Sequence, residues 1–229
     1  MSIATASSTR TGTENDNADA AATYTAAAGV VGAAVIDGIG HSHGTSTLAP
    51  VLAEAAARTA ATRGPLAGLL TAAQLVSDPG PDGTTPNAVG VVATTYPDGE
   101  TGIAWVGDCD AYGWNGSTLT RYTTPHTVGE QLRYNGAPWE IADTHDNWVR
   151  ATLADAVVAT VAQVNIPDPV VLLLSDGVHD QIPHHDFAEL ILEHSADPQA
   201  LATALVTAAS ANADGYRDDA TAIVISTTP

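Results

Sequence analysis

Acidic side chains stand beside apolar runs at several well-separated places in this sequence. Four such positions adjoin runs that are typical of buried strands: Asp37, Asp108, Asp176 and the pair Asp218–Asp219. Three of these runs end at the acidic position, whereas the last run, at residues 221–225, begins just after it. Strands of opposite direction bring such positions to the same edge of a sheet. Carboxylates that are far apart in the sequence are therefore predicted to meet in one site.

A carboxylate site of this kind needs a cation. If Asp37, Asp176 and Asp218 converge, each pair of carboxylates ~4 Å apart repels by roughly 4 kcal/mol at an effective dielectric constant of 20. Oxygen ligands from carboxylates, backbone carbonyls and water suit Mg²⁺ or Mn²⁺, whereas the single cysteine, Cys109, disfavours a closed zinc site. Two such ions about 3.5 to 4 Å apart lower the pKa of a bridging water and direct it at phosphorus. The pattern therefore predicts hydrolysis of a phosphate ester.

The loop after Asp37 offers two further groups for this chemistry. Gly38 lets its carbonyl oxygen approach an ion closely, and a histidine in the loop can protonate a leaving oxygen. We take His41 as the candidate acid and keep His43 as the alternative. Two solvent-exposed loop histidines, or a His-x-His metal pair, are the other readings of the same pattern. Because single Asp-Gly dipeptides are common in turns, the argument depends on the apolar runs that precede Asp37 and Asp176.

Length and charge limit the class of protein. A chain of 229 residues is long enough for one substantial core, so we expect a single domain at residues 19–229 after a flexible lead-in at residues 1–18. The formal net charge is −19, which makes nucleic acid and anionic membranes poor partners. The sequence has no secretory signal pattern and no apolar run of the roughly 20 residues that cross a membrane. We therefore expect a soluble, cytoplasmic protein.

The elements that must position the acidic residues follow from the periodicity of the sequence. In the first half of the chain we expect two strands in residues 20–37, helices at 45–63 and 65–77, and an antiparallel meander over 88–123. A short helix at 127–134 and a partly helical insertion at 139–155 follow. The remainder is expected to form strands near 159–164 and 170–175, helices from Asp186 and from Asp197-Pro198, and a closing strand at 221–225. A turn loop is expected at residues 78–83. This order favours an α+β fold with antiparallel sheets and segregated helices.

Four motifs occur in an order that resembles the type-2C metal-dependent protein serine/threonine phosphatases in their compact bacterial form. They are residues 34–40 (AVIDGIG), 106–112 (VGDCDAY), 174–180 (LSDGVHD) and 218–221 (DDAT). The resemblance runs from about Gly12 to Ile225. It implies a four-layer α-β-β-α sandwich in which two antiparallel sheets are flanked by helices. It also implies removal of phosphate from serine or threonine of phosphorylated proteins, with a Ser/Thr kinase or its targets as partners.

The same resemblance implies a role for each candidate residue. Asp37 would bridge two Mg²⁺ or Mn²⁺ ions, and the carbonyl of Gly38 would complete one shell. Asp176 and Asp218 would hold the other ion, and Asp108 would help to bind a weaker third ion. Two further residues complete the expected site, namely Asp19 as a metal residue from the first motif and His41 as the acid.

Two departures from the family pattern affect the phosphate. Glu14 stands where the family carries a phosphate-binding arginine, and loss of such a contact costs roughly 1.5 to 3 kcal/mol, about ten- to a hundredfold in rate or affinity. Arg10 is the only nearby substitute, and Asp16 competes with Asp19 for the motif's acidic position. Asp110 also replaces an arginine. The leading hypothesis is therefore a weak or specialised phosphatase, and the alternatives are a non-catalytic regulatory or binding module and a small-molecule phosphatase.

Overall fold

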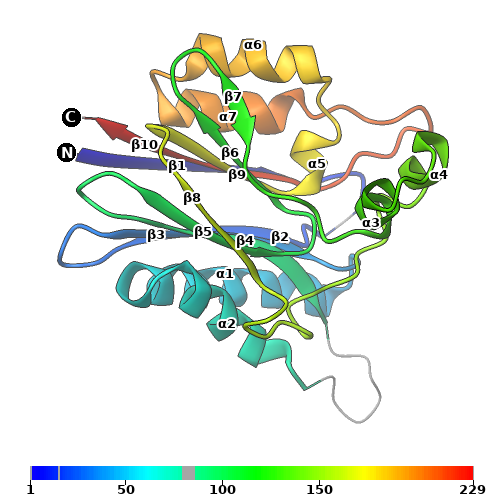
Figure 1. Ribbon diagram of the computed structural model, residues 1–229, viewed down its shortest axis with the longest axis horizontal. Helices are drawn as coiled ribbons and strands as arrows, with labels where there is room; N and C mark the ends of the chain where they lie inside the picture. Colours follow the sequence, from blue (N-terminus) through cyan, green and yellow to red (C-terminus); the bar gives the residue numbers. More distant parts are fainter. Residues whose placement is uncertain (1, 15, 79–85, 229) are drawn as a thin grey trace.

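Two five-stranded antiparallel sheets form the centre of the molecule (Figure 1). The computed structural model describes residues 2–14, 16–78 and 86–228. The first sheet has the order β1 (Ser2–Arg10), β10 (Ala220–Thr228), β9 (Val170–Leu174), β6 (Asp110–Trp114) and β7 (Leu119–Arg121). The second has the order β2 (Asp19–Thr25), β3 (Val31–Gly38), β4 (Ala88–Thr95), β5 (Thr101–Val106) and β8 (Ala162–Ile166).

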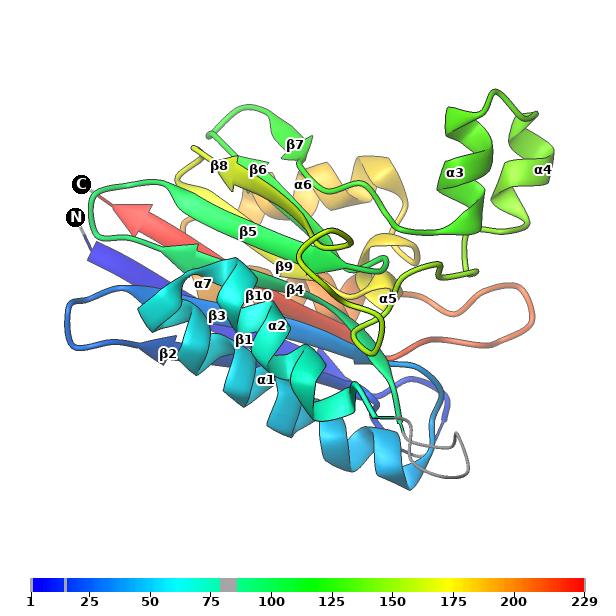
Figure 2. The ribbon, with the colours of Figure 1, turned by 60° about the horizontal axis from the view of Figure 1, so that its bottom comes forward.

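Helices cover the outer face of each sheet. The second sheet is covered by α1 (His43–Arg63) and α2 (Pro65–Val76), and the first by α6 (His184–His194) and α7 (Pro198–Ala208) (Figure 1). Figure 2 shows that α3 (Val128–Tyr134) and α4 (Trp139–Asp143) stand apart from these layers, while the short α5 (Asp176–His179) follows β9 directly. The predicted four-layer α+β sandwich is therefore confirmed. In the part of the chain that the structure describes, no helix has the length and apolar character needed to cross a membrane.

Alternation along the strands builds three apolar cores. In β9, Val171 and Leu173 point between the sheets, while Leu172 and Leu174 point outward to α5, α6 and α7. Alanines of α1 pack on the outer face of the second sheet, where their small side chains let the helix approach closely. Because both faces of the central strands are buried, the positions at which these strands end are fixed with little freedom.

The prediction of a flexible lead-in is wrong for residues 2–10. These residues form β1, which pairs with β10 along its whole length, from Ser2 opposite Thr228 to Arg10 opposite Ala220. The strand is an edge strand with few apolar side chains, so its period-two pattern is weak in the sequence. Residues 11–18 connect β1 to β2, and those of them that the structure describes form no helix or strand. Asn15 lies outside the described residues.

Most other elements form where the sequence predicts them, with one change of topology. The predicted meander is divided, because β4 and β5 belong to the second sheet and β6 and β7 to the first. The chain changes sheets at Gly107, whose φ of 90° is a conformation that favours glycine. The helix predicted from Asp186 begins two residues earlier, at His184, and α5 is an addition. Within the predicted turn loop at 78–83, residues 79–83 lie outside the described residues.

Candidate functional site

Strand register gathers the acidic residues at one end of the sandwich. Asp19, the first residue of β2, pairs with Asp37 near the end of β3. In the other sheet, Leu174 ends β9 opposite both Asp110 and Ala222, so the residues just before β6, after β9 and before β10 lie at one edge. These segments contribute Asp108, Asp176 and Asp218. The prediction that Asp37, Asp176 and Asp218 converge therefore agrees with the register of both sheets.

These residues line one cavity of about 150 Å³. Among the described residues, its acidic lining comprises Asp19, Asp37, Asp108, Asp176, Asp218 and Asp219. The other polar lining comes from His41, from Asn147 in the segment after α4, and from the backbone around Gly38. The cavity is thus a carboxylate pocket, and we use that name for it below.

Two glycines allow the backbone to close around the carboxylate pocket. A Cβ atom on Gly38 would lie 2.3 Å from the Thr45 Cγ2 atom and 2.7 Å from the carbonyl oxygen of Ala18. A Cβ atom on Gly177 would lie 1.9 Å from the carbonyl oxygen of Asp219. These distances leave no room for a side chain at either position. Close packing therefore requires glycine directly after the site residues Asp37 and Asp176.

The carboxylates of the pocket disfavour one another's charge. Burial, followed by repulsion from Asp176, Asp19 and Asp108, raises the pKa of Asp37 well above its usual range, and a hydrogen bond with Asp176 acts in the same direction. Burial is also the main reason why the pKa of Asp176 is raised to about 7, with repulsion from Asp108 and Asp218 adding to it. The pKa of Asp108 is raised to about 6, again chiefly by burial. A positive charge inside the pocket would relieve all three groups.

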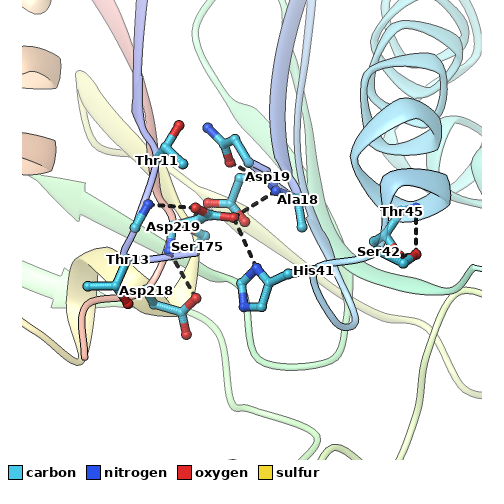
Figure 3. Close-up of polar contacts among 12 residues, drawn as sticks. Thr11, Thr13, Ala18, Asp19, His41, Ser42, Thr45, Ser175, Asp218 and Asp219 are labelled. Atoms are coloured by element: carbon cyan, nitrogen blue, oxygen red, sulfur yellow. Dashed lines mark hydrogen bonds and ion pairs between the residues drawn. The ribbon is translucent and has the colours of Figure 1, made fainter. Parts of the chain in front are cut away.

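Asp19 is held in the site by a neighbouring hydroxyl. Ser175 Oγ donates to Asp19 Oδ2 at 2.7 Å (Figure 3). The same oxygen accepts from the backbone N–H of Thr221 at 3.0 Å. Burial raises the pKa of Asp19 to about 8, although these hydroxyl contacts oppose the shift. Asp16, the other candidate for this position, lies near His43 at 4.0 Å and outside the pocket lining. The structure therefore places Asp19, and not Asp16, with the other carboxylates.

Asp219 is a site residue that the sequence argument passed over in favour of Asp218. Its Oδ1 accepts from the N–H of Gly12 and its Oδ2 from the N–H of Ala18, both at 2.7 Å, and the side chain is 2% exposed (Figure 3). Its own N–H donates to Asp218 Oδ1 at 2.9 Å. Asp219 therefore ties the β1–β2 connection to the start of β10, and its only signal in the sequence is the doubled aspartate.

His41 and His43 occupy different surroundings. His41 lines the carboxylate pocket, with its Nδ1 atom 3.6 Å from Asp219 Oδ2 and its Nε2 atom 3.3 Å from the Tyr216 hydroxyl. The side chain of His43 is 91% exposed at the start of α1. The geometry therefore favours His41 as the group able to exchange a proton with a ligand in the pocket.

The donor set of the pocket fits hard divalent cations. It offers carboxylate oxygens and backbone carbonyls, whereas Cys109 is fully buried in the core between the sheets. Among the described residues, no group of three or more acidic, histidine or cysteine side chains is arranged so that it could hold a metal ion. The carboxylates surround a space instead, which matches the way Mg²⁺ keeps several of its waters and uses few protein ligands. Burial and mutual repulsion raise the pKa values of Asp37 and Asp176, and for Asp176 they outweigh the opposing charge of His179.

The arginines near the pocket are engaged elsewhere. Arg10 donates to the carbonyl oxygens of Thr207 and Ala209 at the end of α7, both at 2.7 Å, so it does not replace the missing phosphate contact. Arg217 donates to the carbonyl oxygens of Thr11 and Gly12. Glu14 is exposed and outside the pocket lining.

Asp110, which replaces an arginine of the family pattern, lies just outside the carboxylate pocket in a separate network. It is fully buried and contacts Arg121 Nη2 at 2.6 Å, His179 Nε2 at 3.4 Å and Thr123 Oγ1 at 2.7 Å. Burial alone would lower the pKa of His179, but the charges of Asp110 and Asp180 outweigh it and raise the pKa to about 9. The negative charge of Asp110 is thus balanced within the protein.

Comparison with solved structures identifies the fold. A bacterial serine phosphatase superposes with a TM-score of 0.79 at 17% identity, over 99% of this chain and 98% of that chain. The serine/threonine phosphatase Stp1 from Staphylococcus aureus gives 0.75 at 17% identity, over 100% and 96% of the two chains. PppA, a regulatory component of the T6SS in Pseudomonas aeruginosa, gives 0.75 at 20% identity, over 100% and 99%.

Comparison of the sequence alone does not find this similarity to phosphatases. No protein-family model matches the chain, and no curated protein matches its sequence. At identities of 20% or below, the solved structures establish the arrangement of the chain and leave its chemistry to the site itself. The chain therefore has the fold of the bacterial serine/threonine phosphatases, as its resemblance to the type-2C family predicts.

Proposed function

We propose that this protein is a Mg²⁺- or Mn²⁺-dependent phosphatase that hydrolyses phosphoserine or phosphothreonine in proteins. The observation that carries the proposal is the carboxylate pocket, in which aspartates from five separate segments lie together and burial and mutual repulsion raise the pKa of the central Asp37. The fold that the chain shares with serine/threonine phosphatases supports the same conclusion.

The chain would hold two ions with the residues that the motifs predict. Asp37 lies centrally, because Asp176, Asp19 and Asp108 all raise its pKa, and it is the candidate bridging ligand. The carbonyl of Gly38 and the carboxylates of Asp176 and Asp218 complete the set, with Asp108 and Asp19 available for a weaker third ion. Bound divalent cations would supply Lewis acidity, which lowers the pKa of water and polarises a phosphoryl oxygen.

The remaining residues would position the substrate and move a proton. His41 faces the pocket and can protonate the leaving serine or threonine oxygen, while Asp219 and Tyr216 hold its ring from two sides. Ser175 fixes the Asp19 carboxyl group. Fixed carboxylates and a fixed imidazole reduce the reorganisation that the reaction needs.

A second candidate function is favoured by the arginine contacts. Because Arg10 and Arg217 are bound to backbone carbonyls and Glu14 is exposed, no arginine lines the pocket among the described residues. A protein of this fold without a phosphate anchor can serve as a binding or regulatory module for a phosphoprotein or a kinase. Such a module would bind ions and ligand without turnover.

Turnover with and without a pocket carboxylate separates the two functions. We expect hydrolysis of p-nitrophenyl phosphate and of a phosphothreonine peptide in Mn²⁺, with a loss of at least about a hundredfold in kcat for Asp176→Asn. Glu100→Gln, which removes a carboxylate at the opposite end of β5, is the matched control and keeps wild-type rates. Equal rates for wild type and Asp176→Asn would show that the observed hydrolysis does not come from this site.

A further inference from the structure

We propose that the substrates are phosphorylated segments with arginine or lysine next to the phosphorylated residue, and that a second cavity beside the carboxylate pocket receives the basic side chain. This proposal rests on the proposed phosphatase function and names its substrate class. It is carried by two independent observations, namely the placement of the arginines and the lining of the second cavity.

All seven basic residues of the chain are arginines, and all seven are described residues that are absent from the lining of the carboxylate pocket. Six of them contact other groups of the protein: Arg10, Arg58, Arg121, Arg133, Arg150 and Arg217. Arg63 lies in the last turn of α1, a helix of 21 residues whose first turn is near the pocket, which places it roughly 30 Å away. Within the described residues, the carboxylate pocket therefore offers no cationic side chain besides His41.

This distribution of charge has a direct consequence for recognition. A phosphorylated serine or threonine carries about −1.5 to −2 charges at pH 7, and the protein carries a formal net charge of −19. Ions in the pocket would neutralise the phosphate locally, but acidic residues around it would still be repelled at the rim. A segment that carries its own positive charge is attracted instead, and it supplies the cation that the protein does not provide.

The second cavity has the lining that such a side chain needs. It has a volume of about 120 Å³, shares Asn147, Asp176 and Asp218 with the carboxylate pocket, and adds Asp180, Asn212 and Tyr216. Asn147 lines both cavities, so a ligand in one lies beside a ligand in the other. Carboxylate, amide oxygen and an aromatic ring are the groups that recognise guanidinium and ammonium ions.

Asp180 is the carboxylate of this cavity that the metal site does not use. Its side chain is 56% exposed, so it is open to a ligand from solvent. Burial opposes its ionisation, but a hydrogen bond from His179 and the charge of that residue prevail and lower its pKa. The carboxyl group is therefore a permanent negative charge beside the place where the phosphate would bind.

Three phosphothreonine peptides test the proposal, identical except that the residues flanking phosphothreonine are arginine, alanine or glutamate. We expect kcat/KM to be roughly tenfold higher for the arginine peptide than for the glutamate peptide, and the difference to shrink with added salt. Equal values, or a preference for the glutamate peptide, would overturn the proposed substrate class. The affinities of non-hydrolysable phosphonate versions, measured in Mg²⁺, give the same comparison without turnover.

The two proposals can fail separately. Absence of p-nitrophenyl phosphate turnover would overturn the phosphatase function, while a tenfold arginine preference in peptide affinity would still support the substrate class. Conversely, active enzyme with no peptide preference would overturn the substrate class alone.

Variants locate the preference in the second cavity. Asp180→Asn should lower the ratio of arginine-peptide to alanine-peptide kcat/KM by about threefold or more, whereas Glu100→Gln removes the same charge at the far end of β5 and leaves the ratio unchanged. Asn147→Arg places a cation between the cavities and should shift the preference toward the glutamate peptide. This variant decides the question even if Asp180→Asn disturbs folding through its contact with His179. An unchanged preference in Asn147→Arg would place recognition elsewhere.

Discussion

Two buried aspartates that are only two positions apart in the sequence have opposite surroundings. Asp108 faces the carboxylate pocket, where burial and like charges raise its pKa to about 6. Asp110 is absent from the pocket lining and contacts Arg121 and His179 in a network that balances its charge. The protein's own cations therefore balance Asp110, whereas in the pocket burial and repulsion outweigh the charge of His179. Buried negative charge marks a ligand site only where the fold provides no positive partner.

The sharpest test of this comparison removes one carboxylate from each site. Without metal, Asp37→Asn should raise the free energy of unfolding by about 1 kcal/mol, because it removes a carboxyl group whose ionisation burial and the neighbouring carboxylates oppose. With Mn²⁺ it should lose at least about a hundredfold in kcat. Asp110→Asn should instead lower the free energy of unfolding by roughly 2 to 3 kcal/mol, because Arg121 and His179 lose their partner. Urea unfolding in EDTA measures both signs, and the same sign for both variants would refute the distinction.

The next largest effect is expected at the cation of the balanced network. Arg121→Ala should lower the free energy of unfolding by roughly 2 to 3 kcal/mol, toward the low end for a buried pair because 38% of the arginine side chain is exposed. Added Mg²⁺ should not restore this loss. Arg58→Ala, which breaks an exposed pair with Glu54 on α1, serves as the control and should cost less than about 1 kcal/mol. Equal costs would mean that Asp110 is not neutralised by Arg121.

A smaller effect separates the sites by pH. The pKa values of Asp19 and Asp176 are raised to about 8 and about 7 in the folded protein, above the ordinary value near 4. The folded state therefore retains protons that the unfolded state releases, so without metal the stability should fall as pH rises from about 4 to 8. Mg²⁺ should raise Tm more at pH 8 than at pH 5.5, which differential scanning fluorimetry in EDTA and in Mg²⁺ would measure. A Tm in EDTA that increases over this range would contradict the raised pKa values.

The smallest expected effect concerns Glu14. Although the family pattern places an arginine there, the residue is exposed and outside the pocket lining. Glu14→Arg should therefore raise kcat/KM for p-nitrophenyl phosphate by less than about fivefold. Asn147→Arg, which adds the same cation at the wall of the pocket, is the comparison variant and should give the larger gain. A tenfold gain from Glu14→Arg would mean that the β1–β2 connection reaches the phosphate site.

The sequence predicts the central strands and the aspartates at their ends because a fully buried strand must be apolar and its end must be polar. Asp37 and Asp176 follow such runs directly, and both lie in the pocket. The resemblance to a known family added Asp19, which periodicity alone does not single out. Edge strand β1 escaped prediction because its side chains are half-exposed and polar.

Residues that depend on irregular backbone were beyond such reasoning. Asn147 comes from the segment after α4, which has no periodicity, and Tyr216 comes from the connection between α7 and β10. Asp218 and Asp219 are neighbours just before β10. A single sequence does not reveal the direction in which each of the two side chains points. The division of the hairpins between two sheets depends on the turn at Gly107, which has no local signal beyond a glycine.

The pairing of β1 with β10 has a consequence for biosynthesis. Strand β1 is synthesised well before its partner β10 and must wait for it, since Ser2 lies opposite Thr228 and β10 also separates β1 from β9. The second sheet is complete once β8 has emerged, whereas the first stays open until β10 has emerged. An incomplete nascent chain thus presents unpaired strand edges, and the final nine-residue strand acts as the closing step of folding.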